Sequence, residues 1–154
     1  MSKSKEKIIG FARKRGLKIK DLGDDGFLTE YESNIVNISC DIFHGTIKEE
    51  IVSFTCMIVI GCPVDTQLLA RLVGFSGRCS TSASLILIKD GILAKWTMLG
   101  GKHIDEDNFF TMLSSVAVIS NSLDMSFRSS YGCQSGVDFV RDSLREKDGN
   151  NVEW

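Results

Sequence analysis

Apolar residues recur along the chain with two different periods, and the order of these periods predicts the fold. At residues 34–43 and 51–60 every second residue is apolar, which is the pattern of a β-strand with one dry face. In the first of these strands the intervening residues are polar, so a slip of one residue would bury Asn and Asp side chains. The register of this strand is therefore strongly specified.

Shorter strands are predicted at residues 27–31, 84–88 and 92–99. The last two are joined by Lys89-Asp90-Gly91, and an Asp-Gly turn between apolar runs is a strong signal for a β-hairpin. The sequence thus predicts that these two strands are antiparallel neighbours.

A helical period of about 3.6 residues marks the remaining elements. We expect an amphipathic helix at residues 4–15, a helix at 65–73, and a long helix at 105–127 that begins at the capping residue Asp105. A last short helix is expected around Val137, Val140 and Leu144. The helix at 65–73 has four apolar residues that predict its buried stripe, namely Leu68, Leu69, Leu72 and Val73.

The elements follow one another in the order α-β-β-β-α-β-β-α(-α). This order predicts an α+β fold with an antiparallel sheet of about five strands flanked by helices. A chain of 154 residues fits a single domain. We expect its core at residues 4–131, followed by a short helix and a polar tail at 132–154.

Composition and charge exclude several classes of protein. Hydrophobic residues make up 43% and charged residues 25%, as in ordinary globular proteins, and the net charge of −2 gives no reason to expect nucleic-acid binding. The N-terminus lacks the apolar core of a signal peptide, and no apolar run is long enough to cross a membrane. We therefore expect a cytoplasmic protein without membrane contact. The basic residues of the first helix predict either a solvated face or a contact with an acidic partner.

The five cysteines do not form a recognisable metal or redox motif. They show no CxxC spacing, so we expect reduced thiols that pack as small hydrophobic groups, with no zinc site and no cofactor. Cys133 is the strongest candidate for a reactive thiol, because a helix is predicted to begin just after it.

No catalytic residue is predicted. The loop at residues 74–81 is rich in glycine and serine, but it lacks the Lys-Ser/Thr pair of a phosphate loop and does not lead from a strand into a helix. His44 and His103 fall in predicted turns, and no nucleophile is paired with either. One alternative stays open, namely a small-ligand sensor or enzyme that uses this loop or the region of Cys133 and His103.

The strand at residues 51–60 is apolar on both faces toward its end. Two interpretations follow: the strand is covered on both sides, or Met57 and Val59 contribute to a subunit interface. For Trp96 and Met98 the alternative to a partner contact is ordinary core packing. The candidate partner-binding residues are Met57, Val59, Leu93, Trp96 and Met98.

The order of elements over residues 4–131 resembles the type III secretion chaperone-like fold, including its YbjN-like branch of bacterial regulators. The resemblance rests on the first helix, the strands at 36–42 and 52–60, the helix at 65–73, the hairpin at Lys89-Asp90-Gly91 and the long helix. It implies a small cytoplasmic protein, usually acidic and frequently dimeric, that binds a polypeptide without nucleotide. We therefore expect a non-enzymatic protein-binding module, either chaperone-like or regulatory, that forms a homodimer and binds a partner protein or peptide.

Overall fold

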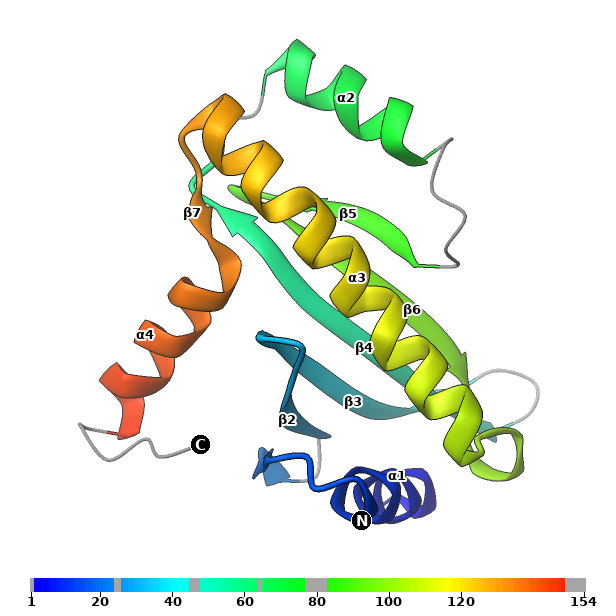
Figure 1. The fold of residues 1–154 in the computed structure, drawn as a ribbon. Helices are drawn as coiled ribbons and strands as arrows, with labels where there is room; N and C mark the ends of the chain where they lie inside the picture. Colours follow the sequence, from blue (N-terminus) through cyan, green and yellow to red (C-terminus); the bar gives the residue numbers. More distant parts are fainter. Residues whose placement is uncertain (1, 24–25, 45–47, 64, 77–82, 149–154) are drawn as a thin grey trace.

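The computed structural model describes residues 2–23, 26–44, 48–63, 65–76 and 83–148. It has the predicted α+β architecture, in which one antiparallel sheet packs against helices (Figure 1). The long helix α3 crosses one face of the sheet, and α1 and α2 lie at its two sides (Figure 1). The fourth helix, α4, contacts β3 and β4.

The sheet is larger than predicted, because the described residues form seven strands instead of five. Their order is β1-β2-β3-β4-β6-β5, and β7 pairs with the end of β4. The two additional strands, β1 and β7, have three and two residues, which is too short for an alternating pattern to show. The bounds are β1 (Ile19–Asp21), β2 (Gly26–Tyr31), β3 (Asn34–His44), β4 (Lys48–Ile60), β5 (Ser84–Ile88), β6 (Gly91–Leu99) and β7 (Gln134–Ser135).

The helices agree with the sequence pattern within a few residues. They are α1 (Lys3–Lys14), α2 (Thr66–Ser76), α3 (Glu106–Tyr131) and α4 (Gly136–Asp148), with a short 3-10 turn η2 (Gly101–His103) before α3. Asp105 is the N-cap of α3, as predicted, and its side chain accepts a hydrogen bond from the backbone N–H of Asn108 at 2.8 Å. Gly132 ends α3 in a left-handed conformation, with φ of 67°.

The registers of β3, β4 and β6 place one apolar face of the sheet beneath α3. Val36 of β3 lies opposite Cys56 of β4, which lies opposite Ala94 of β6, and all three are buried. The same face continues with Ile38, Phe54 and the half-buried Trp96. Because Phe54 also contacts the ring of Phe109 on α3, the core lies between this face and the helix.

Among the described residues, only α4 covers the other face of the sheet, and it does so in part. Gly136 at the start of α4 lies so close to the backbone of Met57 that any larger residue would force the two apart. Further along α4, Arg141 binds Glu30 of β2 at 2.9 Å. The rest of this face is more polar and includes the facing hydroxyls of Ser53 and Thr97, 3.3 Å apart. Met57 is thus half-buried by a helix of its own chain.

The basic residues of α1 are not all on a solvated face, so that part of the prediction is wrong. Lys5 is 1% exposed, and its ammonium binds the carboxylate of Asp21 at 2.6 Å and the carbonyl of Gly23. Lys14 and Arg15, at the end of the helix, pair with Glu106 at 2.6 and 3.5 Å. The partners are distant in sequence, so only the fold shows that these charges bind within the chain.

Candidate functional site

The strand β5 is the last strand on one side of the sheet, so its outer side has no partner strand among the described residues (Figure 1). Its sequence, Ser-Leu-Ile-Leu-Ile, contains no charged residue, no proline and no glycine. Natural proteins usually protect such an edge with charges, proline, bulges or a covering segment, because free backbone groups pair readily with another strand. An unprotected aliphatic edge of this kind is a candidate site for strand addition.

The hairpin turn determines which backbone groups of β5 point outward. Lys89 and Asp90 form a two-residue turn, and Ile88 and Gly91 are the last paired residues before it. In such a hairpin the two residues that flank the turn form a hydrogen-bonded pair, and the direction of the backbone groups alternates along the strand. It follows that Leu85 and Leu87 direct their N–H and C=O groups toward the open side.

The side chains of β5 divide between the two faces of the sheet. Leu85 lies opposite Ala94 and Leu87 opposite Ile92, so both leucines are on the face that carries the helices. Leu85 packs against the core, whereas Leu87 is 37% exposed. Ile86 projects from the opposite face. A strand added to β5 would therefore meet aliphatic side chains on both of its faces.

Helix α2 lies beside β5 and contacts it. Asp65 caps the helix by accepting a hydrogen bond from the N–H of Leu68 at 2.8 Å. Leu68 and Leu72 are buried, as predicted for the apolar stripe. Leu69 and Val73 are 44% and 74% exposed, so the prediction that they are buried is wrong. A helix presents only one narrow face to the core. Leu69 and Val73 each follow a buried leucine by one residue, which is a rotation of about 100° around the helix axis.

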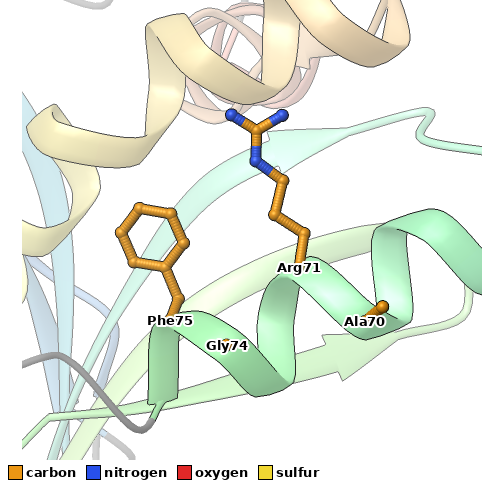
Figure 2. Close-up of a pocket in the computed structure, with 4 residues that line it drawn as sticks. All are labelled: Ala70, Arg71, Gly74 and Phe75. Carbon is orange, nitrogen blue, oxygen red and sulfur yellow. The ribbon is translucent and has the colours of Figure 1, made fainter.

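The opposite flank of α2 faces α3. Figure 2 shows Arg71 and Phe75 pointing from α2 toward α3. The guanidinium of Arg71 donates to the hydroxyls of Ser126 and Ser130 on α3, at 2.8 and 3.0 Å. Because Arg71 and Phe75 face α3, Leu69 and Val73 lie on the flank turned away from it, toward the open side of β5. We call Leu69, Val73, Leu85, Ile86 and Leu87 the β5 edge strip.

A hollow of ≈ 400 Å³ lies on the α3 side of α2, lined by Ala70, Arg71, Gly74 and Phe75 (Figure 2). Among the described residues of this lining, Arg71 is the only charged one, and its donors are already engaged by serines. Gly74 belongs to α2 instead of the predicted loop, and residues 77–82 lie outside the described part of the chain. The described part of the lining offers no acid, base or nucleophile for chemistry.

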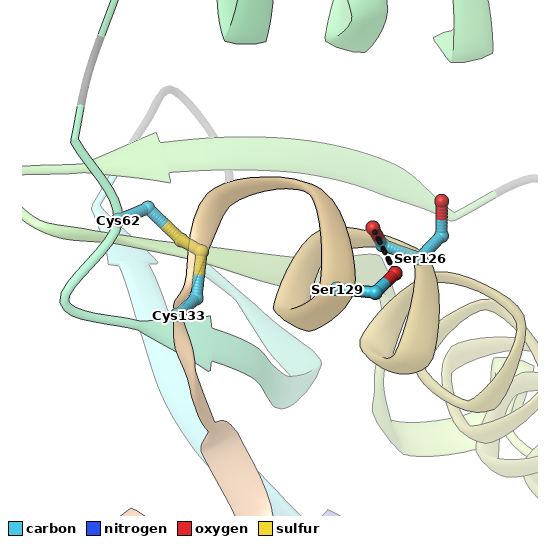
Figure 3. Close-up of a disulfide and its surroundings, with 4 residues drawn as sticks. All are labelled: Cys62, Ser126, Ser129 and Cys133. Carbon is cyan, nitrogen blue, oxygen red and sulfur yellow. Dashed lines mark hydrogen bonds between the residues drawn. A yellow bond between two sulfur atoms is a disulfide. The ribbon is translucent and has the colours of Figure 1, made fainter.

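Cys133 is joined to Cys62 by a disulfide, so the prediction of reduced thiols is wrong for this pair (Figure 3). Cys62 follows β4 and Cys133 follows the Gly132 cap of α3, and the fold brings their Cα atoms to 4.8 Å across a sequence separation of 71. No local spacing can predict such a pair. Cys40 and Cys56 are free and buried, as predicted, and burial raises the pKa of each thiol to about 11. Cys79 lies outside the described residues.

The structure does not bring His103 and Cys133 together, whereas most of the loop at residues 74–81 lies outside the described residues. His103 is exposed in η2, before the start of α3, whereas Cys133 follows its end. A helix of 26 residues separates them by about 39 Å. Among the described residues, no group of three or more acidic, His or Cys side chains could hold a metal ion. In the same part of the chain, no helix has the length and apolarity needed to span a membrane.

The structure does not place the five predicted partner-binding residues on one surface. Met57 and Leu93 lie opposite each other on the face that α4 partly covers. Trp96 and Met98 pack against the core on the α3 face, and Val59 is completely buried. Contact of any of them with a partner stays a prediction. The sequence did not predict the β5 edge strip. A signal for it was present, because α2 has more apolar residues than one narrow face can bury and the next strand, β5, has no charged residue.

Comparisons with known proteins add no family. No protein-family model matches the chain, and no curated protein matches it.

Proposed function

We propose that this protein is a non-enzymatic protein-binding module that takes an extended polypeptide segment along the β5 edge strip. The observation that supports the proposal is the open edge itself, which combines outward backbone groups with exposed aliphatic side chains. The mode of binding is strand addition, in which main-chain hydrogen bonds provide affinity and alternate side chains provide specificity.

Each part of the β5 edge strip has a role in this proposal. The outward N–H and C=O groups of Leu85 and Leu87 bind the backbone of the added strand. On the helix side, side chains of the added strand pack against Leu87, Leu69 and Val73, of which Val73 is 74% exposed. On the other face they pack against Ile86. Burial of these apolar groups supplies free energy in addition to the hydrogen bonds.

The resemblance to type III secretion chaperones is compatible with this mode of binding and forms part of the proposal. A chaperone-like or regulatory module needs a surface for polypeptide and no catalytic residues. We also propose a cytoplasmic location, which the free and buried thiols of Cys40 and Cys56 support. The Cys62–Cys133 disulfide counts against this location, because disulfides are rare in the reducing cytoplasm.

The test uses the direction of the backbone groups. Leu87→Pro removes an N–H that points away from β6, so it blocks strand addition and leaves the β5–β6 pairing in place. Leu87→Val is the matched control, because it keeps the N–H and an aliphatic side chain. Each protein is purified under native conditions from the source cells, which also express a differently tagged copy of the chain, and bound polypeptides are quantified by mass spectrometry.

We expect the wild type and Leu87→Val to retain a stoichiometric polypeptide, whether this is another protein or the second copy. The amount of polypeptide bound to Leu87→Pro should be at least 10-fold lower, which corresponds to a loss of binding free energy on the order of 1.4 kcal/mol. The melting temperatures of the three proteins are compared to exclude unfolding. Retention of every bound polypeptide by a folded Leu87→Pro variant would refute the proposal.

A further inference from the structure

We infer that the Cys62–Cys133 disulfide is opened by an anionic low-molecular-weight thiol that enters the hollow beside Cys133, and that its opening releases α4 from the sheet. Disulfides in a reducing compartment are usually transient, and they often sense the redox state. None of the residues involved belongs to the β5 edge strip, so this site can be tested separately from strand addition.

The disulfide lies at the base of α4. Cys62 follows the end of β4 by two residues, and Cys133 directly precedes β7, which leads into α4 (Figure 3). The two residues of β7 pair with Val59 and Ile60 at the end of β4. A pairing of this length provides few hydrogen bonds, so the covalent bond is the strongest link between β4 and the start of α4.

The packing of α4 on the sheet is weak apart from this link. Among the described residues of α4, Gly136 is the only buried one. The apolar side chains of α4 are half-buried or exposed, namely Val137, Phe139, Val140 and Leu144. The ion pair of Arg141 with Glu30 has side chains that are 37% and 30% exposed, and such pairs contribute little. Reduction should therefore release α4 by local unfolding and expose Met57 beneath it.

A hollow of ≈ 480 Å³ lies against Cys133. It is formed by the last two turns of α3 and the residues that follow, and its lining consists of Met125, Arg128, Ser129, Gly132 and Cys133. Cys62, which is 4% exposed, is not among the described residues of this lining. A thiolate that enters the hollow therefore meets the Cys133 sulfur first.

The charge of the hollow selects the thiol. Arg128 is the only charged residue in the described lining, and its side chain is 49% exposed. Its Nη1 binds Asp124 at 3.2 Å. The carbonyl end of a helix repels an anion, so the attraction for an anionic thiol depends on this guanidinium. A thiol that carries carboxylates, such as glutathione, has the groups that arginine binds well.

The disulfide opens in two exchange steps. A thiolate of the small molecule attacks Sγ of Cys133, the bond to Cys62 breaks, and Cys62 leaves as a thiolate. A second thiolate attacks the small-molecule sulfur of this mixed disulfide, and Cys133 leaves. The two cysteines take up the two protons that the small thiols lost. The protein thus gains two electrons, and two small thiols become one disulfide.

The first test is the release of α4, measured by amide exchange with mass spectrometry. The folded protein is compared in its oxidised form, after reduction with glutathione under native conditions, and as Cys62→Ser/Cys133→Ser, always with Cys79→Ser to remove another thiol. We expect exchange in α4 to be about 10-fold faster in the reduced protein and in the double variant, with smaller changes in β3 and β6. Glutathione should not change the double variant further.

The second test is the charge of the hollow, with free thiols counted by alkylation and mass spectrometry over time. The reductants are glutathione, which is anionic, and cysteamine, which is cationic. Arg128→Ala should slow the reaction with glutathione roughly 3-fold but not the reaction with cysteamine, and added salt should reduce the difference. Arg145→Ala is the matched control, because Arg145 is 65% exposed on α4, and it should react like the wild type.

Each outcome decides one part. If α4 keeps its protection after reduction, or if α4, β3 and β6 lose protection equally, the release of α4 is overturned. If Arg128→Ala and Arg145→Ala react alike with glutathione, the hollow is not the entry site. Neither measurement involves β5, whereas the loss of polypeptide from Leu87→Pro tests strand addition alone. The proposed function and the redox site can therefore fail independently.

Discussion

At one edge of the sheet lies β1, three residues long, and at the other lies β5, with five residues. β1 contains Lys20 and Asp21 and is next to α1, whereas β5 is aliphatic apart from Ser84. Asp21 binds the buried ammonium of Lys5 from α1, so the short edge is attached to a helix by a charge. No such contact covers the outer side of β5 among the described residues.

If the proposed strand addition occurs, this difference determines at which edge it takes place. A sheet with two open edges would add strands at both sides, whereas a sheet with one open edge is complete after a single addition. At β1, Asp21 binds the buried ammonium of Lys5 from α1, whereas β5 is aliphatic apart from Ser84. The comparison teaches that the two edges have separate chemistry, so each can be changed without the other.

The largest expected effect comes from the disulfide, which lies on neither edge. Cys62→Ser/Cys133→Ser should lower the free energy of unfolding by about 4 kcal/mol, because the bridge closes a loop with a sequence separation of 71 and restricts the unfolded chain. Urea denaturation measures this. If the open edge depends on its own residues, the variant should still associate in dilute denaturant-free buffer. Reductant should change the wild type and have no further effect on the double variant.

The next largest effect should open the closed edge. Lys5→Ala removes a long side chain that is 1% exposed, and it should cost about 3 kcal/mol of stability through the cavity left behind. Amide exchange in β1 should then increase more than exchange in β5. Lys3→Ala, on an exposed part of the same helix, is the control and should stay within about 0.5 kcal/mol of the wild type. Equal increases in both strands would show that the edges are not independent.

Lowering the pH should destabilise the region of α1 and β1 before it destabilises β5. Three carboxylates have a pKa that is lowered by an accepted hydrogen bond. The donor is Lys5 for Asp21, the Ser4 hydroxyl for Glu50, and Lys14 for Glu106. The pKa values are lower in the folded state, so these carboxylates stabilise it above the ordinary values of 3.8 for Asp and 4.5 for Glu. This stabilisation is lost as the pH falls from those values through the lowered ones.

The residues around α1 should therefore lose protection from amide exchange below about pH 4.5, whereas β5, which has no titratable group, should lose it only at global unfolding. Exchange measured by mass spectrometry from neutral to acidic pH tests this order. Asp21→Asn should reduce the pH dependence near β1. Simultaneous loss of protection in α1 and β5 would contradict a separate acid-sensitive edge.

The smallest effect on stability, and the most selective, should come from Leu87→Lys. Leu87 is partly exposed, so the free energy of unfolding should change by only about 0.5 kcal/mol. A lysine on an edge strand opposes pairing, so association should be lost. Lys20→Leu removes a charge from the closed edge and should create no new association. If Lys20→Leu does associate, the charge of Lys20, and not the neighbouring helix α1, prevents pairing at the β1 edge.

The sequence predicted those parts of the fold that depend on near neighbours. The alternation at residues 34–43 predicted which face of this strand is buried, and Asp105 was predicted to cap α3, because both effects act within one strand or one helical turn. The candidate site was not predicted in this way. Leu69 and Leu72 look alike in a helical pattern, yet one is exposed and the other buried, because the position of the sheet beneath α2 decides which flank is covered.

By itself, then, the sequence determined the types and order of the helices and of the five longer strands, and the buried face of β3, since periodicity, capping and turn chemistry are local properties. Only the tertiary structure decided which strands are the edges, that Lys5 binds Asp21 at one of them, and that Cys62 meets Cys133. Those features join residues far apart in sequence, and their positions depend on how all elements pack at once.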